Sequence, residues 1–280
     1  MVNASMDALQ APMAMALRRA RDYALEKQSP GGGFCFYRGY YLEEPNLADT
    51  WHGIAVLADL LGVGLARRLE HADFIARQAV EPQPFALYYR IRGLLMLGMA
   101  DPAQADVKRV VAALRADPPD PARPYLFGTA LQRLRCVLWS RRHLGMDVAT
   151  DRWVDALLAM ANADGGYGTP SNLLDTEAAV AVLELCDAKP CPATSAFVSS
   201  MGDPQFGFRL TATSRSPNLE TVHAGITSCR RLDLGIPHAS AATAFVLSCQ
   251  TGSGGFARTA DALPDLALTH MALKALAVCA

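Results

Sequence analysis

The chain has 280 residues, of which 51% are hydrophobic and 19% charged, and its formal net charge is −1. This composition excludes an intrinsically disordered chain, and the balanced charge without a Lys/Arg-rich run excludes a nucleic-acid-binding surface. No apolar stretch approaches the roughly 18 residues that a membrane span needs, so we expect no transmembrane segment. The seven cysteines form no CxxC pair, and the N-terminal charges follow the apolar residues, the reverse of a signal peptide. Both features predict a cytoplasmic protein with reduced thiols.

Four segments along the chain repeat one pattern. A Gly-aromatic element leads through a polar loop and a Pro or Asn to a Leu beside an acid, and an apolar helix follows. These segments begin at Gly31, Asp164, Gly202 and Gln250.

The acids of these segments have a regular spacing. Asp175, Glu220 and Asp265 are 45 residues apart, and Asp49 lies 126 residues before Asp175, which is three steps of 42. Two further units should therefore lie between, and "PFALYYRIRGLLMLGM" and "YLFGTALQRLRCVLWSRRHLGM" fill that gap with helical patterns that lack the glycine loop. A fixed period of this size indicates a repeat architecture.

Each unit pairs two kinds of helix. The first is charged and apolar on one face only, as a helix of an outer layer would be, and the second is apolar all round, as a covered inner helix would be. The outer helices are expected near 8–27, 65–79, 102–115, 150–162, 190–201 and 237–250. The inner helices are expected near 47–61, 85–98, 126–144, 173–186, 219–232 and 265–278. Six such pairs predict an all-α fold, an α6/α6 toroid in one domain over 1–280, with the inner-helix N-termini on one rim of a central cavity.

The pattern Gly-Gly-Phe, polar loop, Leu-x-Asp-Thr and apolar helix resembles the repeat of prenyltransferases and squalene cyclases. "CQTGSGGFA" at 249–257 is similar to the Gln-Gly-Gly-Phe signature of that group. The resemblance covers nearly the whole chain, strongly in four units and weakly in two. It implies an isoprenoid or other small apolar substrate in the toroid cavity, and it is specific for the fold rather than for the reaction.

Class II terpene cyclases of this group carry an Asp-x-Asp-Asp-Thr motif whose middle acid protonates the substrate. Asp49-Thr50 and Asp175-Thr176 match its end, but Asn and an apolar residue replace the upstream acids in both units. Carbon-skeleton chemistry of this type would therefore need another acid, kept protonated by an apolar site. The candidate catalytic acids are Asp49, Glu220 and Asp265.

Protein prenyltransferase β subunits hold zinc with Asp-x-Cys on one inner helix and His on the next. The matching residues here are Asp175, Glu177 and His223, so a carboxylate stands in place of the thiolate. The resemblance implies a divalent metal, and the carboxylate favours iron or manganese while zinc stays open. Magnesium would accompany a bound diphosphate, although basic residues that grip a diphosphate ahead of this Asp are absent. A partner subunit also stays open.

Aromatic and basic residues supply candidate substrate contacts. Phe34, Tyr37 and Trp51 cluster around the first loop with Phe36, Tyr40 and Tyr41, and His52 follows Trp51. Aromatic faces can line an isoprenoid pocket and stabilise carbocations. Tyr88, Tyr89, Arg90 and Arg92 lie on one expected inner helix, where an arginine facing the cavity would suit an anionic group.

Structural roles compete with each of these assignments. Acids at helix starts satisfy free backbone N–H groups, worth roughly 0.5–2 kcal/mol, and the aromatics could simply pack the core. The arginines could reach solvent at the helix end. Three functions therefore stay open: terpene-cyclase-like chemistry, a metal-dependent oxidative or Lewis-acid reaction at Asp175, Glu177 and His223, and a non-catalytic toroid that binds a lipid or a partner protein.

Overall fold

The computed structural model describes residues 2–38, 42–117, 119–120, 123, 126–148 and 151–279, with side chains described from residue 11 onward except those of 151 and 152. The chain divides into two compact units. Unit 1 contains Met1–Val111, Val246–Val278 and Ala280, and unit 2 contains Ala112–Phe245 and Cys279. The single domain expected over 1–280 stays a prediction.

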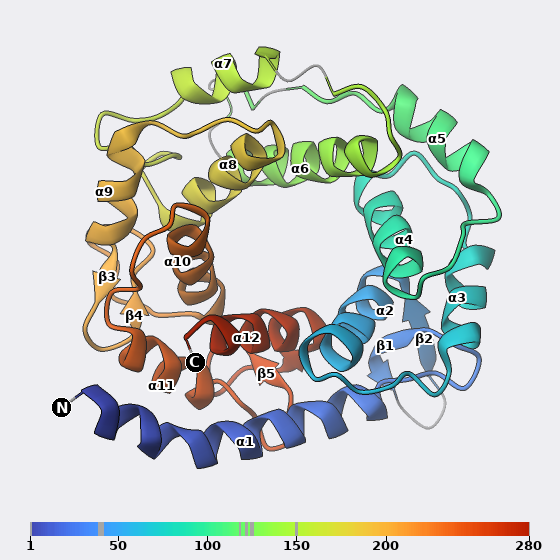
Figure 1. The fold of residues 1–280 in the computed structure, drawn as a ribbon, viewed down its shortest axis with the longest axis horizontal. Coiled ribbons are helices and arrows are strands. Elements are labelled where there is room, and N and C mark those ends of the chain that lie inside the picture. The colour runs from blue at the N-terminus through green and yellow to red at the C-terminus, as the bar shows by residue number, and fades with distance from the viewer. Residues whose placement is uncertain are drawn as a thin grey trace. The chain divides into compact units, whose positions relative to one another are not determined.

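Unit 1 joins the N-terminal part of the chain to its last helix (Figure 1). Its elements are α1 (Val2–Glu26), β1 (Phe34–Arg38), β2 (Glu43–Asn46), α2 (Leu47–Ile54), the π-helix η1 (Ala55–Leu60), α3 (Arg68–Arg77), α4 (Pro84–Met96), β5 (Phe256–Ala257), β6 (Pro264–Asp265) and nearly all of α12 (Leu266–Cys279). Helix α2 packs against α4. The fully buried core residues of unit 1 include Phe34, Ile54 and Leu57.

Unit 2 is built around α8, which packs between α6 and α10 (Figure 1). Its elements are α6 (Phe127–His143), α7 (Asp151–Ala159), α8 (Leu173–Leu185), α9 (Pro192–Ser200), β3 (Gly202–Asp203), β4 (Gly207–Phe208) and α10 (Leu219–Arg231). Leu131, Tyr167 and Phe208 are fully buried in its core. Helices α5 (Gln104–Ala113) and α11 (Ala239–Ser248) cross the two boundaries between the units.

The helices lie where the hydrophobic periodicity predicts them. Those expected after the loops agree with α2 through η1, α4, α6, α8, α10 and α12 to within two residues at each end. The preceding helices agree to within three residues, except that α1 begins at Val2 rather than near residue 8. Three short antiparallel hairpins, β1–β2, β3–β4 and β5–β6, occupy loops in which no strand was expected.

A capping pair starts both α2 and α8. The Asn46 Oδ1 atom accepts the backbone N–H of Asp49 at 2.9 Å, and the Asn46 amide donates to Asp49 Oδ2 at 2.5 Å. Asn172 and Asp175 repeat the same two bonds at 2.9 and 2.6 Å. The reciprocal bonds satisfy one backbone donor of the helix and the side-chain amide at the same time.

A threonine then ties three of the four glycine loops to the helix that follows. The threonine lies four residues after the capping residue, and its Oγ1 atom accepts the backbone N–H of the buried aromatic residue that follows the glycines. The three bonds are Phe34 to Thr50, Tyr167 to Thr176 and Phe256 to Thr269, each 3.0 Å long. In the remaining loop the corresponding residue is Val222, and the aromatic Phe208 pairs with Gly202 in the hairpin.

The glycines bring each loop into contact with a neighbouring helix. Gly165 (φ +85°) lies so close to the backbone of Ala193 and Thr194 at the start of α9 that no side chain would fit, and the Thr194 hydroxyl donates to the Gly165 carbonyl at 2.8 Å. Gly254 (φ +96°) touches the Arg19 carbonyl of α1 in the same way. Both positions need a left-handed backbone and no Cβ, and glycine alone meets both needs without strain.

Helix α1 is fastened to the C-terminal part of unit 1. The Arg19 guanidinium donates to the carbonyls of Thr251 and Gly252 at 2.8 and 3.0 Å, and Gln250 donates to the Ala16 carbonyl at 2.8 Å. The Tyr23 hydroxyl donates to the Pro264 carbonyl at 3.1 Å. Figure 1 shows α1 running beside the β5 segment.

Within the described ranges, no helix is both long enough and apolar enough to cross a membrane. All seven cysteines are free, and five of them are buried.

Replacing Thr176 by valine tests the loop-to-helix bond. Valine keeps the shape of the side chain but leaves the buried N–H of Tyr167 without its acceptor, so we expect the free energy of unfolding to fall by about 1–3 kcal/mol. Urea denaturation measures it, and Thr213→Val at an exposed loop position is the control. A loss no larger than that of the control would contradict the proposed role of the bond.

His71 gives the stability a definite pH dependence. Its ring is fully buried and stacks on Phe34, and its Nδ1 atom accepts the backbone N–H of Gly33 at 3.0 Å. Burial, with a smaller contribution from Arg67, lowers the pKa of His71 to about 4. Below about pH 6.5 the unfolded chain therefore binds a proton at His71 that the folded chain does not bind. The free energy of unfolding falls as the pH drops, by about 1.4 kcal/mol per pH unit, until the pKa of the folded state is reached. In urea denaturation between pH 7.5 and 4, the slope of the native protein should exceed that of His71→Asn by about 1.4 kcal/mol per pH unit.

Candidate ligand-binding site

A cluster of aromatic and histidine side chains lies in unit 1 where α2, α4 and α12 meet. We call it the aromatic cluster, and its members are Trp51 and His52 from α2, Tyr88, Tyr89 and Arg92 from α4, and His270 from α12. Trp51 packs its ring against those of Tyr89 (5.5 Å between centroids), Tyr88 (6.2 Å) and His270 (4.9 Å, edge to face). Rings at these distances and angles attract one another beyond simple burial.

Arg92 lies against the faces of two of these rings. Its guanidinium carbon is 4.2 Å from the ring centre of Trp51 and 5.2 Å from that of Tyr88. The Arg92 Nη1 atom donates to the Tyr88 hydroxyl at 2.5 Å. The indole N–H of Trp51 is buried and has no hydrogen-bond partner within the described part of the chain. A buried donor left without a partner costs stability, so it marks a place where an acceptor on a ligand or a water would be favourable.

Two histidines contact each other beside Trp51. The Nδ1 atoms of His52 and His270 are 3.1 Å apart, and both rings are buried. In a hydrogen bond between them, one Nδ1 atom carries the proton and the other accepts it. Burial, followed by the nearby Arg92 charge, lowers the pKa of His52 to about 3. The His52 ring is therefore uncharged at neutral pH.

The backbone of this site is unusual as well. Helix α2 continues without a break into η1, where the N–H of Leu61 bonds to the carbonyl of Val56 at 3.2 Å. A π-helix is rare and occurs often at functional sites. It begins three residues after His52.

Four of the six residues expected to contact a substrate meet in this cluster. They are Trp51, His52, Tyr88 and Arg92, and the structure adds Tyr89 and His270 to them. Phe34 and Tyr37 lie elsewhere. Phe34 is buried against Gly53, and Tyr37 is 60% exposed on β1. Tyr40 and Tyr41 are outside the described residues.

Arg90 belongs to the core and neither faces a cavity nor reaches solvent. Only 1% of it is exposed, and it forms a two-bond ion pair with Asp101 at 2.6 and 2.8 Å. Its remaining donors bond to the carbonyls of Ile75, Ala76 and Gln78 at the end of α3, at 2.8 to 3.1 Å. It thus satisfies carbonyls that the end of that helix leaves unpaired.

The candidate catalytic acids are all engaged at helix starts. Asp49 is nearly buried in its capping pair, and burial raises its pKa although Asn46 and Lys27 oppose the shift. Asp265 is itself the capping residue of α12, because its Oδ1 atom accepts the Leu268 N–H at 2.6 Å. Glu220 lies in the first turn of α10, behind the cap Asn218. Asp175, Glu220 and Asp265 are thus evenly spaced in the sequence, yet each lies at a different position relative to the residue that caps its helix.

The three expected metal ligands do not form a metal site. Asp175 is held by Asn172, Glu177 forms ion pairs with Arg135 at 3.8 Å and Arg231 at 3.5 Å, and His223 lies 3.4 Å from the Thr227 hydroxyl. No group of three or more His, Cys, Asp or Glu side chains among the described residues is arranged to hold a metal ion. The residues present therefore do not fit the metal that the sequence pattern implied.

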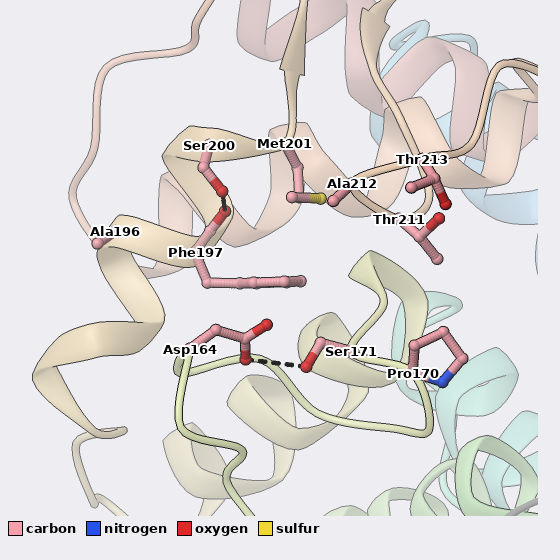
Figure 2. Close-up of a pocket in the computed structure, with 10 residues that line it drawn as sticks. All are labelled: Asp164, Pro170, Ser171, Ala196, Phe197, Ser200, Met201, Thr211, Ala212 and Thr213. Atoms are coloured by element: carbon pink, nitrogen blue, oxygen red, sulfur yellow. Dashed lines mark hydrogen bonds between the residues drawn. The ribbon is translucent and has the colours of Figure 1, made fainter.

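A pocket of about 480 Å³ lies in unit 2, and none of the candidate site residues lines it. Figure 2 shows the ring of Phe197 crossing it, with Asp164 and Ser171 on one side and Met201 on the other. Asp164 accepts hydrogen bonds from the Ser171 hydroxyl at 2.8 Å and the Gly166 N–H at 2.9 Å, so this carboxylate stabilises its own loop. We therefore take the aromatic cluster as the candidate site.

Among solved structures, the chain is similar to Candida albicans protein geranylgeranyltransferase-I complexed with GGPP, with a TM-score of 0.66 and 15% sequence identity over 83% of each chain. At that identity the likeness concerns the fold. No curated protein matches the sequence.

A family model for the prenyltransferase alpha-alpha toroid domain matches residues 125–280, more than half of the chain. This match and the structural similarity confirm the all-α toroid fold and the superfamily expected from the glycine-loop repeat. The chain belongs to the prenyltransferase alpha-alpha toroid domain family.

Proposed function

We propose that this protein is an enzyme that binds an isoprenoid, or a similarly apolar molecule with an anionic head group, at the aromatic cluster and rearranges its carbon skeleton. The observation that carries the proposal is the position of Arg92 against the faces of Trp51 and Tyr88. The family of the chain supports it, as does the similarity to a structure complexed with GGPP.

The chemistry of the cluster suits such a ligand at both ends. The side chains of Trp51, Tyr88 and Tyr89 are apolar and polarisable, and rings of this kind stabilise positive charge that develops on a hydrocarbon chain. The Arg92 guanidinium can bond to two oxygens of a carboxylate or diphosphate at once. The indole N–H of Trp51 supplies one more donor.

Terpene-cyclase-like chemistry also needs a group that starts the reaction. Asp49 is the best placed of the candidate acids, because it lies on the same helix as Trp51 and His52 and burial raises its pKa. A raised pKa increases the fraction of the carboxyl group that is protonated, and the protonated acid can donate a proton to a double bond. Asp265 is less suited, since it uses an oxygen to cap α12.

The competing function is a toroid that binds a lipid-like ligand without converting it. Turnover separates the two, because an enzyme releases more product than there is protein, whereas a binding protein releases the ligand unchanged. The assay incubates catalytic amounts of the full chain with geranylgeranyl diphosphate and related prenyl compounds and analyses the products by mass spectrometry.

Arg92→Met tests the binding step. Methionine fills similar space without charge, so we expect it to weaken binding of geranylgeranyl diphosphate by about 10- to 100-fold, the loss expected for one charge-assisted interaction. Calorimetric titration measures the affinity, and Arg109→Met, at an exposed position on α5, is the control. If Arg92→Met and Arg109→Met bind geranylgeranyl diphosphate with equal affinity, Arg92 is not part of the binding site.

Asp49→Asn and Asp175→Asn separate acid catalysis from helix capping. Both carboxylates accept the amide of a capping asparagine with nearly the same geometry, so both changes should lower the melting temperature alike. If Asp49 is the acid, Asp49→Asn lowers kcat by about 10²-fold or more, while Asp175→Asn leaves it near the native value. Similar activity in both variants would show that Asp49 is only a cap.

A further inference from the structure

The residues that match metal ligands in related toroids take part in a different interaction here. We infer that Glu177, with Arg135 and Arg231, forms an ion-pair cluster that joins α6, α8 and α10, and that this protein binds no metal ion at Asp175, Glu177 and His223. The inference rests on the local contacts of these side chains and is independent of the function proposed above.

Asp175 is half-buried and already bonded to the residue that caps its helix. Its Oδ2 atom accepts the Asn172 amide at 2.6 Å. A Cβ atom built on Gly128 would lie 2.6 Å from the Asp175 Oδ1 atom, and one built on Gly168 would collide with Oδ2. Each oxygen of Asp175 therefore lies beside the backbone of a glycine, and Oδ2 is already used by the cap.

Two arginine side chains lie beside the carboxylate of Glu177. The Arg135 guanidinium of α6 is 3.8 Å away and that of Arg231 of α10 is 3.5 Å away, and the Glu177 side chain is only 15% exposed. A divalent ion placed at this carboxylate would meet two guanidinium groups that are always charged. Like charges at such distances repel more strongly when the surroundings exclude water.

Arg231 extends the cluster along α8. Only 16% of its side chain is exposed, and it also pairs with the exposed carboxylate of Glu184 near the end of that helix. One arginine thus touches two carboxylates of α8, and one carboxylate touches arginines from two helices. Truncating one partner of such a shielded pair leaves the other charge without compensation, which destabilises a protein more than losing an exposed pair does.

The first test measures metal. The full chain, purified without a metal-binding tag, should contain far less than one zinc, iron or manganese ion per chain by mass spectrometry, and added Zn²⁺ or Mn²⁺ should leave its melting temperature unchanged. A real site saturated with metal would raise the melting temperature. A stoichiometric metal that disappears in both Asp175→Ala and Glu177→Ala would overturn the inference.

The second test measures the ion pairs by a double-mutant cycle. Glu177→Gln and Arg231→Met should each lower the melting temperature by a few degrees, and the double variant should lose clearly less than the sum, because the two side chains contact each other. Glu184→Gln, which removes the exposed carboxylate, should have a smaller effect than Glu177→Gln. Additive losses, or an equal effect of the two glutamate variants, would contradict the cluster.

Discussion

The hydrogen bond from the N–H of a buried aromatic residue to a threonine hydroxyl organises the fold at three places along the chain. In each case one residue of a loop and one residue of the helix that follows it satisfy each other in the core, as for Phe34 and Thr50. The bond orients the loop, and the loop's glycine can then approach the next helix, as Gly165 approaches α9. Without it a buried N–H would be orphaned and the contact between loop and helix would lose its register.

Hydrophobic periodicity and the glycine loops were enough to predict the fold class and the helix bounds, because both reflect local rules that each repeat obeys. The short hairpins could not be predicted in this way. Pairings such as Phe256 with Asp265 depend on the loop folding back, and the two- to five-residue strands carry no alternation that distinguishes them from turns. Thr50 and Thr176 were visible only as part of an Asp-Thr pair, in which the acid drew attention although the threonine makes the tertiary bond.

The candidate site was only partly predictable, for a different reason. Trp51, His52, Tyr88 and Arg92 were singled out by residue type, but the chain separates His52 from His270 by 218 residues, and no local pattern reveals that they touch. Arg90 and Arg92 look alike in sequence, yet one closes the end of α3 and the other lies on indole. Glu177 shows what matching positions to relatives leaves out, since the two arginines that it pairs with come from α6 and α10.

The attachment of α1 to the C-terminal part of unit 1 has a consequence for how the protein is made. Gln250 and Ala16 are bonded across 234 positions of the chain, and Arg19 reaches Thr251 over nearly the same interval. During synthesis on the ribosome, α1 emerges before the region beyond residue 250 and stays without this partner until that region has followed. Contacts between such distant parts of a chain form late and slow folding, and they leave early segments exposed to aggregation. Unit 1 should therefore be the later of the two units to complete its folding and the one that depends more on chaperones.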